Sequence, residues 1–345
     1  MPSSIKPAAP VERYTAANGA LIFRIAVEAF TDFYAWTYLV LADDAITLLD
    51  TGSSYPATIR DLRRGFDLIR DEFRTPVSLA DVQTILITHG HIDHYGGLNA
   101  VLPFTPRARV AVHELDLRIL VNHDERVVMI SKRMDNFLQQ AGVSDERRAR
   151  LLQMYLAAKT FFRSVEVHEV IHHDTTLPGG LEVFHVPGHC PGQLVTRVDD
   201  ILLSADQVLP RISPHQSPES IVNYTGLGHY LESLQKVKTI GGIRLALGGH
   251  ETPIPDLYTR ITEIEKTHAQ RLARVLDICR APEPGLTIND ISHEMFSALS
   301  GYNVLLGLEE AGAHVEYLYQ RGLLAVTNLD EVERAQNPAI RYRRL

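Results

Sequence analysis

The stretch Thr88-His89-Gly90-His91-Ile92-Asp93-His94 places three imidazoles and one carboxylate within six residues, from His89 to His94. It directly follows the apolar run Thr84-Ile85-Leu86-Ile87, which predicts a strand. A strand that ends in a turn can direct all four side chains towards one point, and zinc and similar ions accept His nitrogen and Asp oxygen as ligands. Packing gives no reason for this spacing. The stretch therefore predicts a metal site at a strand end.

Three further candidate ligands follow short apolar segments later in the chain. They are His189 in Pro187-Gly188-His189-Cys190-Pro191-Gly192, Asp206 after Ser204-Ala205, and His250 after Gly248-Gly249. Loops at strand ends carry chemistry on a rigid scaffold. A histidine beside glycine in a loop is a weak signal by itself, but the three residues in this order after the first motif are a strong one.

The complete set resembles the metallo-β-lactamase superfamily, whose pattern is HxHxDH, a later His, a bridging Asp and a final His. The resemblance covers roughly residues 20 to 265, and no ligand position is missing. It implies an α/β fold, the αββα sandwich, with a binuclear metal centre. By this resemblance the first metal would be held by His89, His91 and His189, the second by Asp93, His94 and His250, and both would be bridged by Asp206.

The ligand types also indicate a branch of this family. A bridging carboxylate argues against the antibiotic-hydrolysing lactamases, in which a cysteine commonly occupies that place. It favours thioesterases, glyoxalase II-like enzymes, lactonases and metal-dependent nucleases. Flavodiiron proteins have Glu at the second ligand position, where this chain has His91. We expect two divalent ions, zinc first, with iron or manganese as alternatives because His/Asp sites accept all three.

These residues predict a hydrolase of thioesters, esters or lactones in which a hydroxide between the two metals attacks the carbonyl. Asp93 and Asp206 are the candidate catalytic carboxylates, and no G-x-S-x-G nucleophile elbow is present. Three other hypotheses stay open at this point: a metal-dependent ribonuclease, an iron-dependent sulfur dioxygenase, and a metal-bearing regulatory protein with low turnover.

Three residues are candidates for supporting roles around the metals. Asp50 ends the run Leu48-Leu49-Asp50, and it either orients a ligand histidine through the free ring N–H or acts as a turn residue. Tyr224 and His229 lie in a Gly-containing loop, from which either could reach a substrate. A purely structural role is the alternative for both.

The chain is long enough for two domains. We predict a catalytic domain at residues 16–265 with a helical insert at about 115–163, expected to form an apolar lid. Candidate lining residues of this lid are Met129, Met134, Phe137, Met154, Tyr155, Phe161 and Phe162.

Residues 266–345 predict three helices followed by two strands, which resembles the small winged-helix domain attached to the lactamase-like ribonuclease and thioesterase branch. The third predicted helix, 308–320, carries Glu309, Glu310 and Glu316, and so acidic a helix would repel phosphates. We therefore expect this domain to pack beside the site or to mediate a homodimer rather than to bind nucleic acid.

The composition of the chain indicates what kind of partner it binds and in which compartment it works. The net charge is −8 and no long basic run occurs, which disfavours nucleic acid and leaves a small-molecule substrate. The two cysteines, Cys190 and Cys279, fall in different predicted domains, so we expect no disulfide and a reducing compartment. No secretory pattern and no apolar run of the ~20 residues a membrane helix needs is visible. We predict a cytoplasmic protein.

Overall fold

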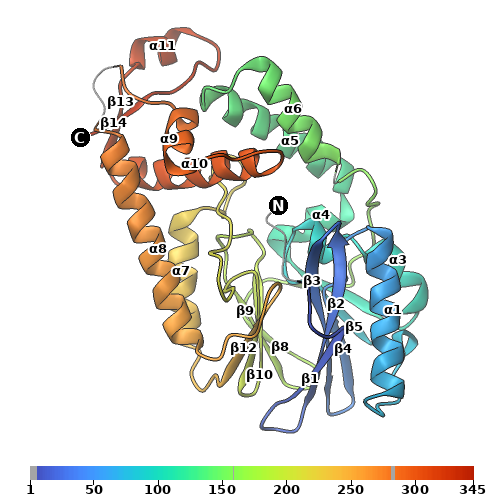
Figure 1. Ribbon diagram of the computed structural model, residues 1–345. Coiled ribbons are helices and arrows are strands. Elements are labelled where there is room, and N and C mark those ends of the chain that lie inside the picture. The colour runs from blue at the N-terminus through green and yellow to red at the C-terminus, as the bar shows by residue number, and fades with distance from the viewer. Residues whose placement is uncertain (1–5, 158, 281–283) are drawn as a thin grey trace.

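Two β-sheets lie face to face with helices on their outer sides in the computed structural model, which describes residues 6–157, 159–280 and 284–345 (Figure 1). The strands of the first sheet, in order, are β1 (Val11–Thr15), β2 (Leu21–Phe30), β3 (Phe33–Ala42), β4 (Ala45–Leu49), β5 (Thr84–Leu86), β6 (Arg109–His113) and β7 (Glu169–Ile171). The strands of the second are β12 (Leu245–Gly248), β11 (Ile201–Ala205), β10 (Leu194–Val198), β9 (Leu181–His185) and β8 (Thr175–Leu177).

The alternation of side chains along the strands produces the layers. Along β2, Phe23 and Ile25 belong to the core beneath α1 (Pro56–Asp71), whereas Ile22 belongs to the core between the sheets. Successive strand residues point to opposite faces, so one strand serves both cores. On the outer side of the second sheet, α7 (Leu227–Lys238) and α8 (Leu257–Ile278) cover a further core. The predicted αββα sandwich is confirmed.

The insert between β6 and β7 is helical, as the sequence predicts. It contains a 3₁₀ turn at Glu114–Asp116 and three helices, α4 (Leu117–Val121), α5 (His123–Gln140) and α6 (Asp145–Ala157). The shorter elements α2 (Ile92–Tyr95), α3 (Leu98–Val101) and the 3₁₀ turns at Leu79–Asp81 and Leu102–Phe104 lie around the first motif and α1.

The C-terminal region contains α9 (Ile288–Met295), α10 (Asn303–Gln320), β13 (Leu324–Val326), α11 (Leu329–Arg334) and β14 (Tyr342–Arg344). Thr287 and Asp290 form a capping box at the start of α9, and β13 pairs antiparallel with β14. The predicted order of three helices and two strands is present, with α11 added between the strands. Because α8 runs unbroken through residues 265 and 266, the division into two domains stays a prediction, as does the winged-helix resemblance.

The insert and the C-terminal helices share one hydrophobic core, which makes them a single roof above the strand ends (Figure 1). Met134 and Phe137 of α5 pack in this core with Leu305 and Leu308 of α10. At Gly312 of α10 an added Cβ would lie 2.8 Å from the Phe137 ring, so glycine permits the close approach of the two helices. The roof therefore joins segments far apart in the sequence.

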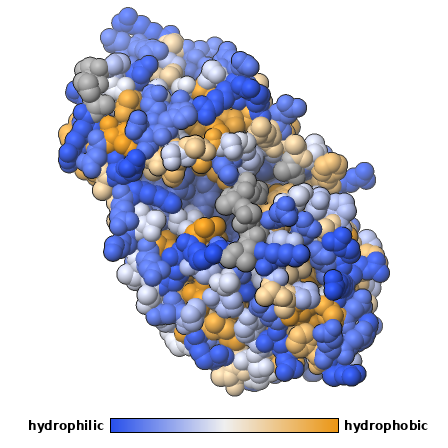
Figure 2. Space-filling model, viewed as in Figure 1, coloured by the Kyte–Doolittle hydropathy of each residue, from blue (hydrophilic) through white to orange (hydrophobic). Residues whose placement is uncertain are grey.

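The face of the molecule seen in Figure 2 is largely hydrophilic, with hydrophobic residues in separate patches. Cys190 and Cys279 are both free and buried, which confirms that they form no disulfide. Within the described residues, no helix has both the length and the apolar character required to span a bilayer.

Candidate metal centre

The ends of strands β5, β9, β11 and β12 bring all seven predicted ligands together. Their ligand atoms form two groups, and within each group the atoms lie within 4.8 Å of one another. The first group contains His89, His91, His189 and Asp206, and the second contains Asp93, His94 and His250. Five of these side chains are buried, while His91 and Asp93 are partly exposed.

Asp206 lies between the two groups. One of its carboxylate oxygens is 3.7 Å from Nε2 of His189 in the first group and 3.3 Å from Nε2 of His250 in the second. The other oxygen is 3.6 Å from Nε2 of His94. Asp93 Oδ2 lies 3.4 Å from Nε2 of His250. The two groups are therefore contiguous, with the carboxylate of Asp206 facing both.

Hydrogen bonds outside the cluster determine which nitrogen of each ring faces inward. Nδ1 of His94 donates to Asp50 Oδ2 at 2.8 Å, and Nδ1 of His250 donates to the Tyr34 carbonyl at 2.8 Å. Since both acceptors lack a proton, each Nδ1 carries the hydrogen. The two Nε2 atoms lie 3.4 Å apart, and in the neutral rings each carries a lone pair that faces the other. A proton or a metal ion between them would remove this repulsion.

The rings of His189 and His89 also donate a hydrogen bond from Nδ1 to a group outside the cluster. Nδ1 of His189 donates to the His215 carbonyl at 2.8 Å. The Thr88 hydroxyl gives its hydrogen to Asp50 at 2.7 Å, so it accepts from Nδ1 of His89 at 3.0 Å. Donation of the outer ring N–H is the arrangement found around metal-ligating histidines. Four of the five imidazoles are thus oriented with Nε2 towards the centre.

Three of the inward atoms have no hydrogen-bond partner in the described part of the protein. Among the described residues, Nε2 of His89, Nε2 of His189 and Oδ1 of Asp206 are buried without a hydrogen bond. Buried acceptors without a donor are rare in folded proteins because their desolvation is not compensated. Lone pairs and carboxylates that converge in this way fit divalent cations.

The electrostatics of the cluster also favour positive charge at its centre. Burial and the neighbouring His94 hold the pKa of His89 well below its ordinary value. Burial acts in the same direction at His250, but the carboxylates of Asp206 and Asp93 raise the pKa of His250 to about 10. The carboxylates thus favour positive charge at the centre, either as a proton on His94 or His250, whose pKa values they raise, or as a metal ion.

Close packing around the ligands explains one glycine of the sequence motif. A Cβ at Gly249 would collide with Oδ1 of Asp206 and lie 2.7 Å from Cε1 of His94. Because Gly249 has no side chain, the end of β12 can place His250 close to Asp206 and His94.

The same set of residues defines the family. The model of the Metallo-beta-lactamase superfamily matches residues 30–264. This chain belongs to that superfamily. A curated relative, the probable metallo-hydrolase YqjP of Bacillus subtilis (strain 168), is 22% identical over 306 residues, which are 85% of this chain and 91% of the relative.

Two solved structures share the fold over nearly the whole chain. A metallo-beta-lactamase family protein of Thermus thermophilus is 23% identical with a TM-score of 0.74 over 94% of this chain and 98% of that one. A beta-lactamase domain protein of Burkholderia ambifaria is 22% identical with a TM-score of 0.73 over 100% of this chain and 98% of that one. The common fold thus includes the C-terminal helical region.

The chain is therefore related to metallo-hydrolases, and its His/Asp cluster is suited to divalent ions. Asp50 supports that cluster. Following β4 with φ of 60°, a conformation that Asp tolerates better than most residues, it accepts hydrogen bonds from the Thr88 amide and hydroxyl and from His94. The predicted contact of Asp50 with a ligand histidine is therefore present.

The C-terminal region supports the cluster through residues that the sequence analysis did not identify. Nε2 of His215, whose carbonyl holds His189, lies 2.8 Å from Oε2 of Glu309 on α10. Glu316 accepts hydrogen bonds from the Glu219 and Ser220 amides at 2.7 and 3.1 Å. The acidic residues of α10 therefore bind the loop beside the metal centre. Their spacing along the helix was visible in the sequence, but their partners were not.

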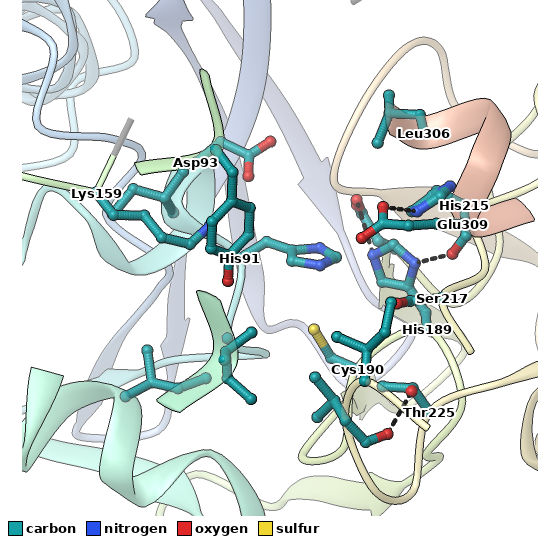
Figure 3. Close-up of a pocket in the computed structure, with 18 of the residues that line it drawn as sticks. His91, Asp93, Lys159, His189, Cys190, His215, Ser217, Thr225, Leu306 and Glu309 are labelled. Carbon is teal, nitrogen blue, oxygen red and sulfur yellow. Dashed lines mark hydrogen bonds and ion pairs between the residues drawn. The ribbon is translucent and has the colours of Figure 1, made fainter. Parts of the chain in front are cut away.

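A cavity of about 280 Å³ adjoins the cluster, and Figure 3 shows His91 and His189 facing each other within it. Its walls are mainly apolar and come from the insert, the ligand loops and α10. Of the seven predicted lid residues, Met134 and Tyr155 line it. The other five do not, because Phe137 and Phe162 pack in cores, and Met129, Met154 and Phe161 face solvent.

Tyr224 and His229 lie outside this cavity, so the structure favours the structural role over the contact with substrate that was considered for both. Tyr224 is 48% exposed, and His229 Nε2 lies 3.2 Å from Glu219 Oε1 in a separate surface depression. The contacts of Glu316 with the backbone of residues 219 and 220 hold the loop against α10 and direct these two side chains away from the metal centre.

Proposed function

We propose that this protein is a binuclear metal-dependent hydrolase acting on a thioester, ester or lactone. One observation carries the proposal: seven inward-facing ligand side chains meet beside a cavity whose walls are mainly apolar. An apolar cavity with a few convergent polar groups is typical of a site for a small molecule.

In this proposal His89, His91 and His189 hold one ion, and Asp93, His94 and His250 hold the other. Asp206 binds both, which its position between the two groups supports. Two divalent cations, with zinc expected first and iron or manganese compatible, supply when bound a hydroxide nucleophile at neutral pH and a Lewis acid for the carbonyl.

The chain's own residues prepare the site for this chemistry. Burial opposes ionisation of Asp93, but His250 and His94 hold the pKa of Asp93 below its ordinary value, so the carboxylate is ionised at neutral pH, as a metal ligand must be. Asp50 and Glu309 act as positioning residues, because they hold His94 directly and His189 through His215. The apolar walls of the roof exclude water and accommodate the acyl part of the substrate.

The same walls favour a small acyl compound over nucleic acid. The acidic side chains of α10 are used inside the protein, where Glu309 binds His215 and Glu310 binds Arg271 and the Gln216 amide. With a net charge of −8, the chain lacks the excess of positive charge typical of proteins that bind a phosphate backbone.

Elemental analysis of wild type and Asp206→Ala, with hydrolysis measured on a panel of acyl thioesters, p-nitrophenyl esters and lactones, tests the proposal. We expect two metals per chain in wild type, one or fewer in the variant, and loss of hydrolysis by more than the roughly 10–100-fold that loss of an outer partner costs. His229→Ala, a surface histidine, is the control. Metal-replete protein inactive on the whole panel would overturn the proposal, and a single iron with O₂-dependent turnover would favour oxygen chemistry.

A further inference from the structure

Two cationic side chains of the insert face the cavity beside the metal centre. They are Arg126 on α5 and Lys159, which follows α6. Figure 3 shows Lys159 on the same side of the cavity as Asp93. Both cations come from the roof, so neither belongs to the ligand-bearing strand ends.

Neither cation has a carboxylate partner among the described residues. No carboxylate oxygen lies within 4.0 Å of the guanidinium of Arg126 or of Nζ of Lys159. The Lys159 ammonium instead lies 4.0 Å from the centroid of the Tyr155 ring. Glu309 also lines the cavity, but its carboxylate is bound to His215 at 2.8 Å.

Both cations are half-buried, and burial removes part of their hydration. It lowers the pKa of Lys159 to about 8 and lowers the pKa of Arg126 below its ordinary value, although the charge of Asp116 acts in the opposite direction on Arg126. A cation removed from water without a partner is costly, and such groups are usually paired. Two half-buried cations without a carboxylate partner are suited to bind an anion in the cavity.

Two phenol groups complete the donor set. Tyr155 and Tyr302 line the same cavity, and within the described part of the chain neither hydroxyl makes a hydrogen bond to the protein. The wall formed by the roof therefore offers an ammonium, a guanidinium and two hydroxyls with no protein acceptor. Between them lie apolar side chains such as Ile130 and Leu306.

We propose that Lys159 and Arg126 bind an anionic group, a carboxylate, phosphate or sulfonate, of a substrate whose apolar part lies in the cavity. The inference rests on the proposed hydrolysis, since the scissile bond would lie at the metal centre and the anion at the cations of the roof. It restricts the substrate class to acyl compounds that carry a negative charge in addition to the reacting carbonyl.

Calorimetric binding of octane-1-sulfonate and octan-1-ol to the metal-loaded protein tests the anion site without turnover. Sulfonate is chosen because it competes poorly for zinc. We expect wild type to bind the sulfonate at least about 10-fold more tightly than the alcohol, as one charged hydrogen bond would provide. Lys159→Met and Arg126→Met should each remove most of this difference and leave binding of the alcohol within about twofold.

Matched controls remove an equal charge from the same helices. Lys132→Met on α5 and Arg150→Met on α6 replace side chains that are 72% and 64% exposed, so long-range charge changes equally while the cavity stays intact. Both should bind octane-1-sulfonate like wild type. Circular dichroism and melting temperature verify that every variant is folded.

A second readout compares p-nitrophenyl hydrogen glutarate with p-nitrophenyl pentanoate, which share the leaving group and chain length. Wild type should have the higher kcat/KM on the glutarate, and Lys159→Met should lose this preference. Sulfonate binding that depends on Lys159 without any hydrolysis would support the anion site and count against the proposed function. Equal binding of sulfonate by wild type, Lys159→Met and Arg126→Met would overturn the inference and leave the function standing.

Discussion

Two buried clusters of histidine and carboxylate side chains differ in where their lone pairs are directed. One is the metal centre at the strand ends, and the other contains His268 of α8 with Glu310 and His314 of α10. In the metal centre, Nε2 of His94 and Nε2 of His250 face each other at 3.4 Å after both Nδ1 hydrogens have been donated outward. A proton or a metal ion must separate them.

The helical cluster requires no such cation. Nδ1 of His314 donates to the Glu310 carbonyl at 2.7 Å, which leaves Nε2 as an acceptor 3.2 Å from Nδ1 of His268. Nδ1 of His268 can carry this hydrogen, so the contact between the two rings needs no cation, although Nε2 of His268 is buried without a hydrogen bond. The Glu310 carboxylate is 2.8 Å from Arg271 and accepts from the Gln216 amide at 2.9 Å. Among the described residues, the metal centre thus has three buried atoms without a hydrogen bond, Nε2 of His89, Nε2 of His189 and Oδ1 of Asp206, whereas the helical cluster has only Nε2 of His268.

The largest expected effect separates the two clusters directly. His91→Ala should lower the metal content and reduce hydrolysis by more than roughly 100-fold, since it removes a ligand rather than an outer partner. His268→Gln should retain the metal content of wild type. Elemental analysis and steady-state kinetics measure both variants. Loss of one metal equivalent from His268→Gln would show that the helical cluster is itself a metal site.

Asp50→Asn should weaken metal binding by about 10–100-fold, the range for loss of a partner of a ligand histidine. Asparagine cannot accept from the Thr88 amide, the Thr88 hydroxyl and Nδ1 of His94 together, because one of its two side-chain atoms is a donor. Competition with a chelator of known affinity measures the change. Asp145→Asn, at a side chain 94% exposed, is the control. If Asp50→Asn binds metal with the affinity of wild type, Asp50 acts only as a turn residue.

Glu310→Gln should lower the free energy of unfolding by about 1–3 kcal/mol without loss of metal, because a buried charged hydrogen bond to Arg271 and the Gln216 amide is weakened. Denaturant titration of the metal-loaded protein measures this, with Glu333→Gln on the exposed side of α11 as the control. A variant as stable as wild type would remove the structural role assigned to the helical cluster.

The smallest expected effect is the pH dependence of anion binding at the roof. There, hydrogen-bond donors lack partners, whereas in the metal centre the atoms without partners are acceptors. Burial lowers the pKa of Lys159 to about 8, so the ammonium is present below this pH and is lost above it. The groups that act on it are Glu309, Asp93, Cys190, Arg126 and Tyr155. Binding of octane-1-sulfonate should weaken by up to about 10-fold between pH 7 and 9.5. Lys159→Met should be insensitive over this range, and an equal decline in that variant would assign the titration to another group.

Local patterns were enough to predict the strands, the insert helices and the ligand set. Short apolar runs followed by His or Asp identify strand ends, because alternating burial and turn residues are encoded within a few positions. The contact between Asp50 and His94 was also predicted, although from a resemblance rather than from spacing. The sequence left the roles of Tyr224 and His229 open because the course of their loop depends on Glu316, which lies 97 residues after Glu219 in the chain.

By itself the sequence determined the identity of the seven candidate ligands, since these depend on short-range pattern and on residue type, and the resemblance that they carry implied the family and the sandwich. Only the tertiary structure decided how the roof closes over them. The core shared by α5 and α10, the link from Glu309 through His215 to His189, and the unpaired cations Lys159 and Arg126 all join segments separated by long stretches of chain. Such contacts are chosen by packing and by which buried groups find partners, and no local pattern records that choice.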